Sequence, residues 1–367
     1  MYEEIVYRMA LPLQTNYGNG KVKLLLEHYG SAKAVFEQYG KQKNTPRRKV
    51  NLIAPLTITK EMLQIIDKER NKMEKEEIGF CFITDENFPK RLKHCQDATY
   101  YFFYKGSDDF HFSKSIAIVG TRKATAYGKD CVKRILSDLA STDMVVISGL
   151  AVGIDTAAHQ YALEFGLRTV GVMGTGFQQI YPKSNTELVE EMLTMNGSVL
   201  SEFFYYSKSD RHNFPIRNKV IAGLADATIV VETAVKGGSM ITAHLANSYH
   251  RDVFAVPGNI FNKTHDGCHE LIRNNWAALI TSGTDLLEMM NWNLEAKPAV
   301  QRQLFRELDA DEEPIVTFIE EKKEASIDEI IGYFNRYTVS KVTSFLLNLE
   351  FKGVLECKPG KIYRVLE

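Results

Sequence analysis

Apolar runs of strand length alternate with amphipathic segments through the central part of the chain, from about residue 79 to residue 293. The first run, SIAIVG, precedes the amphipathic YGKDCVKRILSDLA, and the alternation continues with MVVISG, RTVGVMG, SVLSE, ATIVVE and DVFAVPG. Strands that are apolar along their whole length are typical of a parallel sheet covered by helices on both faces. The pattern therefore predicts an α/β fold, a Rossmann-like doubly wound and mostly parallel sheet over residues 79–293.

The first 78 residues have a different pattern, which is typical of short helices. In KVKLLLEHYGSAKAVFEQYG two apolar-periodic runs flank Gly30, which predicts a helix, a tight turn and a second helix. The basic segment KQKNTPRRKVN predicts a loop, and EMLQIIDKERNKMEKEE predicts an amphipathic helix with a charged face. Such a helical pair can present backbone amides to phosphate, although packing is its more common role. We therefore predict a small helical domain over residues 1–78.

A charged, proline-containing stretch over residues 294–311 predicts a linker after the α/β segment. Residues 312–367 then carry three short helical patterns and, around Pro359 and Gly360, two strand patterns. Three helices and a hairpin predict a winged helix, a domain that usually binds duplex DNA through its third helix. Here the third helix carries Lys341 but is otherwise sparsely basic. Packing or binding of a protein partner is therefore an equally good interpretation.

Composition narrows the classes of protein to consider. The 367 residues are 44% hydrophobic and 25% charged, as in soluble proteins of two or three domains. A net charge of -1 argues against coating nucleic acid through bulk charge, but it permits a local basic groove. The five cysteines are scattered without a CxxC pair, which favours a reducing compartment. With neither a signal-peptide pattern nor an apolar run of membrane-spanning length, we expect a cytoplasmic protein.

The residues that follow the predicted strands combine glycine with basic side chains. Ligands of a doubly wound sheet bind beyond the carboxyl ends of its strands. Glycine lets backbone N–H groups approach an anion, and basic side chains add charge-assisted hydrogen bonds. The candidate residues at these ends are Gly120, Thr121, Arg122, Lys183, Gly237, Gly238 and Ser239. Because four such junctions carry glycine and three also carry a basic residue, we predict a site for a phosphate-bearing ligand.

The stretch HNFPIRNKVIAG, residues 212–223, sets an aromatic ring and a guanidinium in front of an apolar helix. Pro215 restrains the backbone, so Phe214 and Arg217 can be held at a fixed distance from each other. This pairing suits a stacked, negatively charged partner. The alternative is a purely structural role, with Phe214 in the core and Arg217 paired with Glu202 or Glu232.

Familiar enzyme signatures are missing from the sequence. The first strand is followed by G-x-R rather than G-x-G-x-x-G, and no P-loop motif occurs. Ser148 lies outside a G-x-S-x-G elbow. Asp155 and His159 lie one helical turn apart and could exchange a proton, but the helix dipole explains Asp155 without catalysis. We therefore predict no catalytic residue and no cofactor.

One short segment, HDGCHE, gathers metal-ligating side chains. It contains His265, Asp266, Cys268 and His269. Their spacing matches no common zinc signature, so a polar loop is the better interpretation. We predict no metal site.

Six motifs in the same order give the central segment a resemblance to a known family. They are VGTRKATAYG, SGLAVGIDTAAH, GTGFQQIYPKSN, NFPIRNKVIAGL, VVETAVKGGSMITA and VFAVPGNI. On these motifs the chain resembles the DNA-processing protein A family, also called DprA or Smf. The resemblance implies a bacterial cytosolic protein that binds single-stranded DNA without cutting it. It further implies loading of RecA recombinase, displacement of single-strand-binding protein, protection of incoming DNA in natural transformation, and a homodimer formed through the α/β domain.

The resemblance also implies which residues contact DNA. By motif, Arg122, Lys183, Arg211, Phe214 and Arg217 fall in a pocket for phosphates and bases, and Asn218 joins them from the same motif. A stacking face on Phe214 accepts any base and is worth about 1–3 kcal/mol per base in comparable sites. The arginines supply salt-dependent attraction to phosphate, and Lys183 is a point charge that can follow a mobile phosphate. We therefore expect little preference among bases.

The two ends of the chain have weaker counterparts in the family. A winged helix is common at its carboxyl end. A small helical domain of the sterile-alpha-motif or helix-hairpin-helix type corresponds to residues 1–78, where the loop containing Arg47, Arg48 and Lys49 can widen the DNA footprint or be an ordinary solvated loop.

The competing interpretation is an enzyme. Phosphoribohydrolases that cleave nucleoside monophosphates share a related sheet and the signature P-G-G-x-G-T-x-x-E, whose glutamate performs catalysis. The corresponding GGSMITAH keeps Gly237 and Gly238 but has no glutamate on that turn. The sequence therefore favours a non-catalytic DNA-binding protein.

Overall fold

The computed structural model describes residues 2–14, 18–38, 56–292, 308–309 and 311–366. The loop containing Arg47, Arg48 and Lys49 and nearly all of the predicted linker 294–311 lie outside the described residues.

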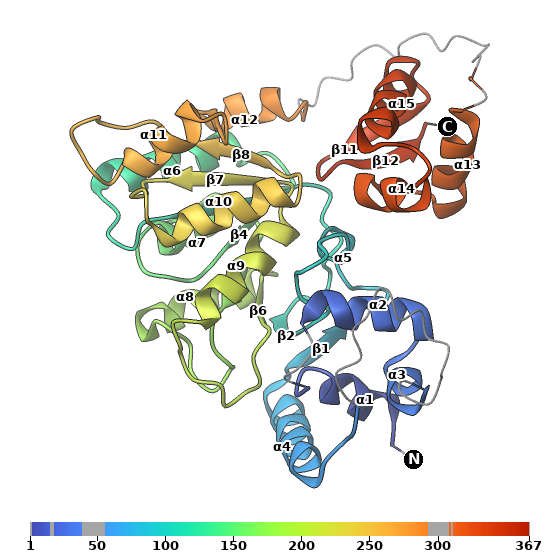
Figure 1. Ribbon diagram of the computed structural model, residues 1–367. Helices are drawn as coiled ribbons and strands as arrows, with labels where there is room; N and C mark the ends of the chain where they lie inside the picture. Colours follow the sequence, from blue (N-terminus) through green and yellow to red (C-terminus); the bar gives the residue numbers. More distant parts are fainter. Residues whose placement is uncertain (1, 15–17, 39–55, 293–307, 310, 367) are drawn as a thin grey trace.

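A nine-stranded sheet forms the middle layer of the largest part of the molecule (Figure 1). Its strand order is β1-β2-β6-β5-β4-β3-β7-β8-β9. Its strands are β1 (Gly79–Phe82), β2 (Tyr101–Gly106), β3 (Ser115–Gly120), β4 (Val145–Ser148), β5 (Thr169–Met173), β6 (Ser198–Ser201), β7 (Ala227–Val231), β8 (Asp252–Ala255) and β9 (Ala278–Leu279). The seven strands β6, β5, β4, β3, β7, β8 and β9 run parallel to one another. The predicted α/β class with a mostly parallel sheet is confirmed.

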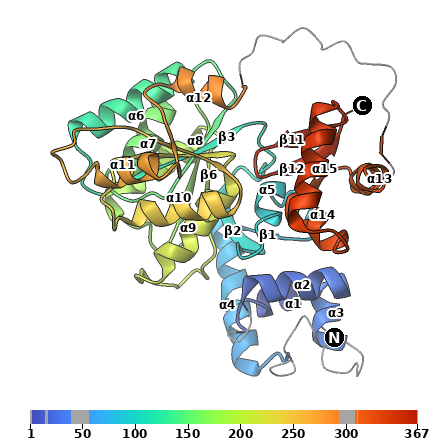
Figure 2. The same cartoon turned by 45° about the horizontal axis from the view of Figure 1, so that its top comes forward.

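Helices cover both faces of this sheet, as Figure 2 shows for α9 and α10 on one side and α6 and α12 on the other. The helices of this part are α5 (Lys90–Lys93), α6 (Ala126–Asp138), α7 (Ile154–Glu164), α8 (Thr186–Thr194), α9 (Asn213–Leu224), α10 (Gly238–Ser248), α11 (Asp266–Arg273) and α12 (Gly283–Met289). On β3, Ala117 and Val119 belong to the core under α9 and α10, whereas Ile116 and Ile118 belong to the core under α6 and α7. Since successive side chains of a strand point to opposite faces, burial on both faces explains the uninterrupted apolar runs.

Two strands at one edge were not predicted from the sequence. β1 and β2 pair antiparallel, and β2 also pairs antiparallel with β6. They are rich in aromatic residues, and the neighbours Phe102 and Phe103 are buried in different cores. The periodic pattern used for the prediction begins only at SIAIVG, so these edge strands escaped it.

The N-terminal helices are α1 (Glu4–Ala10), α2 (Asn19–Tyr29), α3 (Ala32–Gln38) and α4 (Lys60–Glu76). Gly30 ends α2 in the left-handed conformation, with φ of 80°, so the predicted helix-turn-helix around this glycine is confirmed. Helix α4 reaches the α/β part through Glu69, whose carboxylate accepts a hydrogen bond from the Tyr205 amide at 2.8 Å. Burial raises the pKa of Glu69 to about 7.

The C-terminal segment has a core of its own, formed by three helices and a three-stranded sheet of order β10-β12-β11. Its elements are α13 (Glu313–Lys322), β10 (Ala325–Ser326), α14 (Ile327–Tyr333), α15 (Val339–Phe351), β11 (Leu355–Lys358) and β12 (Ile362–Val365). The three predicted helices and the two strands of the hairpin are present, and β10 is an addition. The part of the chain that the structure describes contains no helix long and apolar enough to cross a membrane.

The turn between β11 and β12 contacts the α/β part through Arg251. This arginine is 3% exposed and donates hydrogen bonds to the carbonyl oxygens of Pro359 at 2.8 Å and Arg91 at 2.9 Å. The Gly360 amide donates to the His250 carbonyl at 2.9 Å. Gly360 has a φ of 90°, and a Cβ there would lie 2.1 Å from Arg251 Nη1, so only glycine fits.

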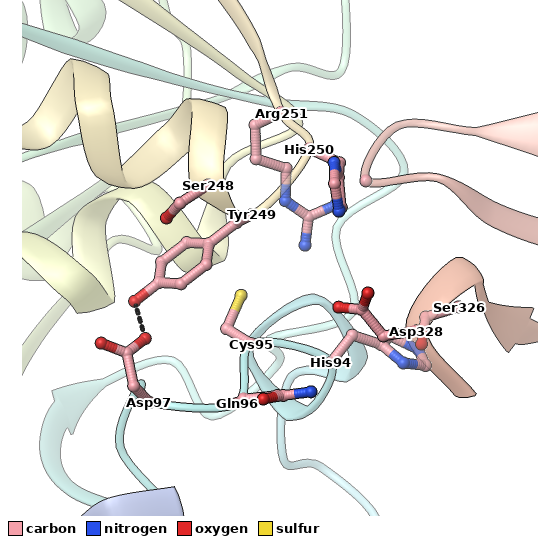
Figure 3. Close-up of a pocket in the computed structure, with 11 residues that line it drawn as sticks. His94, Cys95, Gln96, Asp97, Ser248, Tyr249, His250, Arg251, Ser326 and Asp328 are labelled. Atoms are coloured by element: carbon pink, nitrogen blue, oxygen red, sulfur yellow. Dashed lines mark hydrogen bonds between the residues drawn. The ribbon is translucent and has the colours of Figure 1, made fainter. Parts of the chain in front are cut away.

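A polar pocket of about 240 Å³ lies beside this contact (Figure 3). Glu324 lies next to His94, one of the residues that line this pocket. Its carboxylate oxygens lie 3.7 Å from Lys90 Nζ and 3.4 Å from Lys358 Nζ. A hydrogen bond from His94, together with the charges of both lysines, lowers the pKa of Glu324 to about 2. The C-terminal segment is thus held to the α/β part by hydrogen bonds and ion pairs around a polar pocket.

Candidate functional site

A pocket of about 360 Å³ lies beyond the carboxyl ends of β3 and β7. The chain runs from β3 outward to β4, β5 and β6 on one side, and then crosses to β7, β8 and β9 on the other. Adjacent strands whose connections leave in opposite directions form a crevice, the usual ligand site of this architecture. Nine of the eleven predicted residues line the pocket, namely Gly120, Thr121, Arg122, Phe214, Arg217, Asn218, Gly237, Gly238 and Ser239.

The turn after β3 is held in place by Glu232, which follows β7 and is 1% exposed. Its backbone carbonyl accepts from the Thr121 amide at 2.7 Å, and its carboxylate accepts from the amide and the hydroxyl of Thr125 at 2.9 and 2.5 Å. Gly120 is required here, because a Cβ would lie 1.9 Å from the Val231 carbonyl oxygen. Arg122 is therefore presented to solvent from a fixed turn.

Arg122 and Phe214 form the central contact of the site. The guanidinium carbon of Arg122 lies over the Phe214 ring, 4.8 Å from its centroid, and Phe214 is half-buried. The ring rests against Gly174 at the end of β5, where a Cβ would come within 3.3 Å of it. A cation over an aromatic face contributes about 0.5–1 kcal/mol at exposed sites. The structure thus places an exposed cation over the face of an aromatic ring in the lining of the pocket.

Arg217 lies at the floor of the pocket and is 5% exposed. Its Nη1 donates hydrogen bonds to the carbonyl oxygens of Gly149 and Val172, which end β4 and β5. The alternative that Arg217 pairs with Glu202 or Glu232 is therefore wrong. Burial lowers the pKa of Arg217, and the negative charge of Asp155 offsets part of this shift. This arginine ties Gly149, which follows β4, to Val172 of β5, and its guanidinium carbon lies 5.8 Å from the centroid of the Phe214 ring.

The start of α10 closes the other side of the pocket. Gly237 is the N-cap, and a Cβ on it would lie 2.3 Å from the Thr233 hydroxyl, whereas Gly238 faces open space. Ser239 donates to that hydroxyl at 2.7 Å, and the Asn218 side chain donates to the Gly238 carbonyl at 3.4 Å. The amino end of a helix favours an anion, so this wall suits a phosphate.

Lys183 and Arg211 are the two predicted residues that do not line the pocket. Lys183 is exposed in the short turn that follows β5, and Arg211 is exposed just before α9. Among the residues that the structure describes, the Arg211 side chain hydrogen-bonds to its neighbour His212 alone, with 3.3 Å between the two side-chain nitrogens. Both cations are free to meet a ligand that extends beyond the pocket.

The structure favours the non-catalytic interpretation of Asp155 and His159 over a proton exchange between them. His159 is fully buried, and its Nδ1 lies 2.7 Å from the Thr169 hydroxyl. Burial and the nearby charge of Arg217 lower the pKa of His159 to about 3, so its ring stays neutral at physiological pH. Asp155 does line the pocket, and burial raises the pKa of its carboxyl group.

The HDGCHE segment forms the N-cap (His265) and the first residues of α11, so the polar loop expected from the sequence is wrong. His265 is 3% exposed, and its ring centroid lies 5.4 Å from that of Tyr127. His269 points its Nε2 at the Gly258 carbonyl, 3.1 Å away. Burial raises the pKa of the Cys268 thiol to about 11. Among the residues that the structure describes, no group of three or more histidine, cysteine, aspartate or glutamate side chains is arranged to hold a metal ion.

Glu202 directly follows β6, is buried and does not line the pocket, and burial raises its pKa from the usual 4.5 to about 7. Below pH 4.5 the carboxyl group of Glu202 is protonated in both the folded and the unfolded chain. As the pH rises from 4.5 through 7, the free energy of unfolding falls, because the folded state must finally hold a buried charge. We expect Glu202→Gln to match the wild type near pH 4 and to exceed its free energy of unfolding by about 1–3 kcal/mol at pH 8.

Urea denaturation at a series of pH values measures this difference. The exposed Glu187 provides the control, because Glu187→Gln should leave the pH profile unchanged. Parallel profiles for the wild type and Glu202→Gln would show that the carboxyl group of Glu202 ionises normally in the folded chain.

The family model described as DNA recombination-mediator protein A matches residues 79–291. The chain is 41% identical over 205 residues to DNA processing protein DprA of Streptococcus pneumoniae, covering 56% of this chain and 72% of that protein. It is 32% identical over 315 residues to protein Smf of a Synechocystis species, covering 76% of this chain and 78% of that protein.

The solved structures that resemble this one include two DprA proteins. The X-ray structure of DprA from Streptococcus pneumoniae has a TM-score of 0.56 and 37% identity, covering 62% of this chain and 80% of that chain. The structure of DprA from Helicobacter pylori, reported for its single-stranded DNA binding mode, has a TM-score of 0.52 and 28% identity and covers 58% of this chain and 96% of that chain.

Proposed function

Because the chain belongs to the DNA recombination-mediator protein A family, we propose that it acts in DNA processing by binding single-stranded DNA at the pocket beyond β3 and β7. The observation that carries the proposal is the exposed Arg122 guanidinium over the half-buried Phe214 ring, beside the amino end of α10. The single-stranded DNA binding mode reported for the Helicobacter pylori relative supports the same ligand.

The chemistry of the pocket suits single strands rather than duplex. A base that is free of its partner strand can stack on the Phe214 ring, and every base has such a face. Arg122 and the backbone amides at the start of α10 can hold the adjoining phosphate. Phosphate and stacking contacts read no sequence, so binding should be nearly independent of base composition.

The wider role rests on the family resemblance. We propose that the protein works in the cytoplasm as a homodimer formed through the α/β domain, loads RecA onto DNA, aids displacement of single-strand-binding protein and protects DNA taken up in natural transformation. The proposed domains are residues 1–78, 79–293 and 312–367. A linker at 294–311 joins the second domain to the third. We assign a winged helix to the last domain, and the exposed apolar residues Val339, Leu347 and Phe351 of α15 suit a protein partner better than DNA.

We propose that the protein is not an enzyme. Helix α10 begins Gly238-Ser-Met-Ile-Thr-Ala-His244, so His244 stands where the phosphoribohydrolase signature P-G-G-x-G-T-x-x-E has its catalytic glutamate. Release of free base from nucleoside monophosphates is the measurement that would support the enzymatic alternative.

Fluorescence anisotropy of a labelled single-stranded oligonucleotide, with unlabelled duplex as competitor, tests the proposed function. We expect tight binding that duplex competes for poorly and that weakens as salt rises. Equal competition by duplex, or no binding at low salt, would contradict a single-strand-specific pocket.

A further inference from the structure

Tyr181 is an exposed aromatic residue next to the pocket. It lies in the loop after β5 and is 44% exposed. Its ring centroid lies 6.3 Å from that of Phe214, and the two ring planes are inclined at 53°. In the part of the chain that the structure describes, the Tyr181 hydroxyl has no hydrogen-bond partner. The ring is therefore neither a core residue nor a hydrogen-bonded surface residue.

The loop that carries Tyr181 is fixed to the sheet. Asn185 is 4% exposed, and its side chain donates to the Leu150 carbonyl at 2.8 Å and to the Thr156 hydroxyl at 2.9 Å. On the other side of Tyr181, the Gln178 amide donates to the Tyr205 carbonyl at 3.0 Å. A ring on an anchored loop loses little conformational entropy when a ligand stacks on it.

The geometry of the two rings decides how many bases they can take. A base stacks parallel to a ring, and one flat base cannot lie parallel to two planes that are inclined at 53°. Each ring must therefore receive a base of its own. On protein surfaces that bind single strands, successive bases stack on successive aromatic side chains in this way.

An exposed cation lies close in sequence to each of the two rings. Tyr181 is followed two residues later by the exposed Lys183, and Phe214 is preceded three residues earlier by the exposed Arg211. Each ring thus has a cation on its own segment, outside the pocket. Bases and phosphates alternate along a single strand, as rings and cations do here. Phosphates of a strand that extends beyond the pocket can therefore pair with Lys183 and Arg211.

We infer that Tyr181 is a second base-stacking residue, so that the site takes the bases of two successive nucleotides, one at Arg122 and Phe214 and the next at Tyr181. The inference rests on the proposed function, because it assigns a further contact to the same single-stranded ligand.

The test compares two strands of equal length, an oligothymidylate and an oligomer of the same sugar-phosphate backbone that lacks bases. The difference between their affinities measures what the bases contribute. We expect Tyr181→Leu, which keeps apolar bulk but removes the ring, to weaken oligothymidylate binding about tenfold. Binding of the baseless strand should be unchanged, and Tyr181→Phe should restore binding of oligothymidylate.

Tyr2 provides a matched control, since it is also 44% exposed and its ring centroid lies 6.0 Å from that of Tyr7 in the N-terminal part. Tyr2→Leu should bind both strands as the wild type does. An unchanged affinity of Tyr181→Leu for oligothymidylate, or an equal loss for both strands, would overturn the inference. Absence of single-strand binding by the wild type would instead overturn the proposed function itself, so the two failures are distinguishable.

Discussion

Arg122→Ala is expected to weaken binding of single-stranded oligonucleotides by about tenfold to a hundredfold at moderate salt. A hydrogen bond to a charged group contributes about 1.5–3 kcal/mol, and the cation over the Phe214 ring is lost together with the phosphate contact. Removal of one phosphate contact should also lower the slope of log affinity against log salt by about one. Anisotropy titrations at several salt concentrations measure both quantities.

Three further variants test whether the loss of affinity comes from the charge and the planar group of Arg122. Arg211→Ala should reduce the salt slope in the same way, with a smaller loss of affinity because Arg211 does not contact Phe214. Arg122→Lys should be intermediate, since it keeps the charge but loses the planar guanidinium. Lys133 is exposed on α6 and paired with Glu164, so Lys133→Ala should change nothing. Unchanged binding in both arginine variants would move the DNA site to the terminal parts of the chain.

Asp226→Ala is expected to lower the free energy of unfolding by about 3 kcal/mol. Asp226 is 5% exposed just before β7. Its carboxylate accepts two hydrogen bonds from Arg91, at 2.6 and 2.8 Å, and two from the amide and the hydroxyl of Ser115, at 2.9 and 3.1 Å. Removal of one partner of a buried ion pair typically costs about 3–5 kcal/mol, because the remaining charge stays buried without a counterion.

The matched variant for this prediction is Glu164→Ala. Its pair with Lys133 has an N–O distance of 2.7 Å, but both side chains are about half exposed, at 46% and 47%. An exposed pair contributes at most about 1 kcal/mol. Urea denaturation should therefore separate the two variants clearly, and similar midpoints would show that the Asp226 carboxylate is not needed to neutralise Arg91.

The sheet was predictable from the sequence wherever a strand is buried on both faces. The run Ile116 to Val119 alternates between two cores, and no polar residue interrupts it. The pairing of β2 with β6 was not predictable in the same way. It joins Tyr104 to Leu200, and contacts between segments so distant along the chain leave no local pattern.

The candidate site was predictable to a similar extent. Glycine and basic residues after the strands located the pocket, because strand ends of a parallel sheet meet at one edge. The burial of Arg217 was not predictable, since a polar residue near a helix start is usually solvated. It follows from carbonyl oxygens of Gly149 and Val172, which only the folded sheet brings together. The proximity of the Tyr181 and Phe214 rings was not predictable either, because only the folded sheet brings their two segments together.

The contact of Arg251 with the C-terminal turn has a consequence for work with shortened chains. A chain that ends before residue 308 loses the Pro359 carbonyl, and the guanidinium of Arg251 then keeps only the acceptors of the α/β part. The His250 carbonyl loses its partner as well. Such a deletion removes the C-terminal segment and also uncovers the buried guanidinium of Arg251, so it should lower the melting temperature of the remaining protein. A change in DNA affinity after truncation therefore becomes interpretable only when it is measured well below that melting temperature.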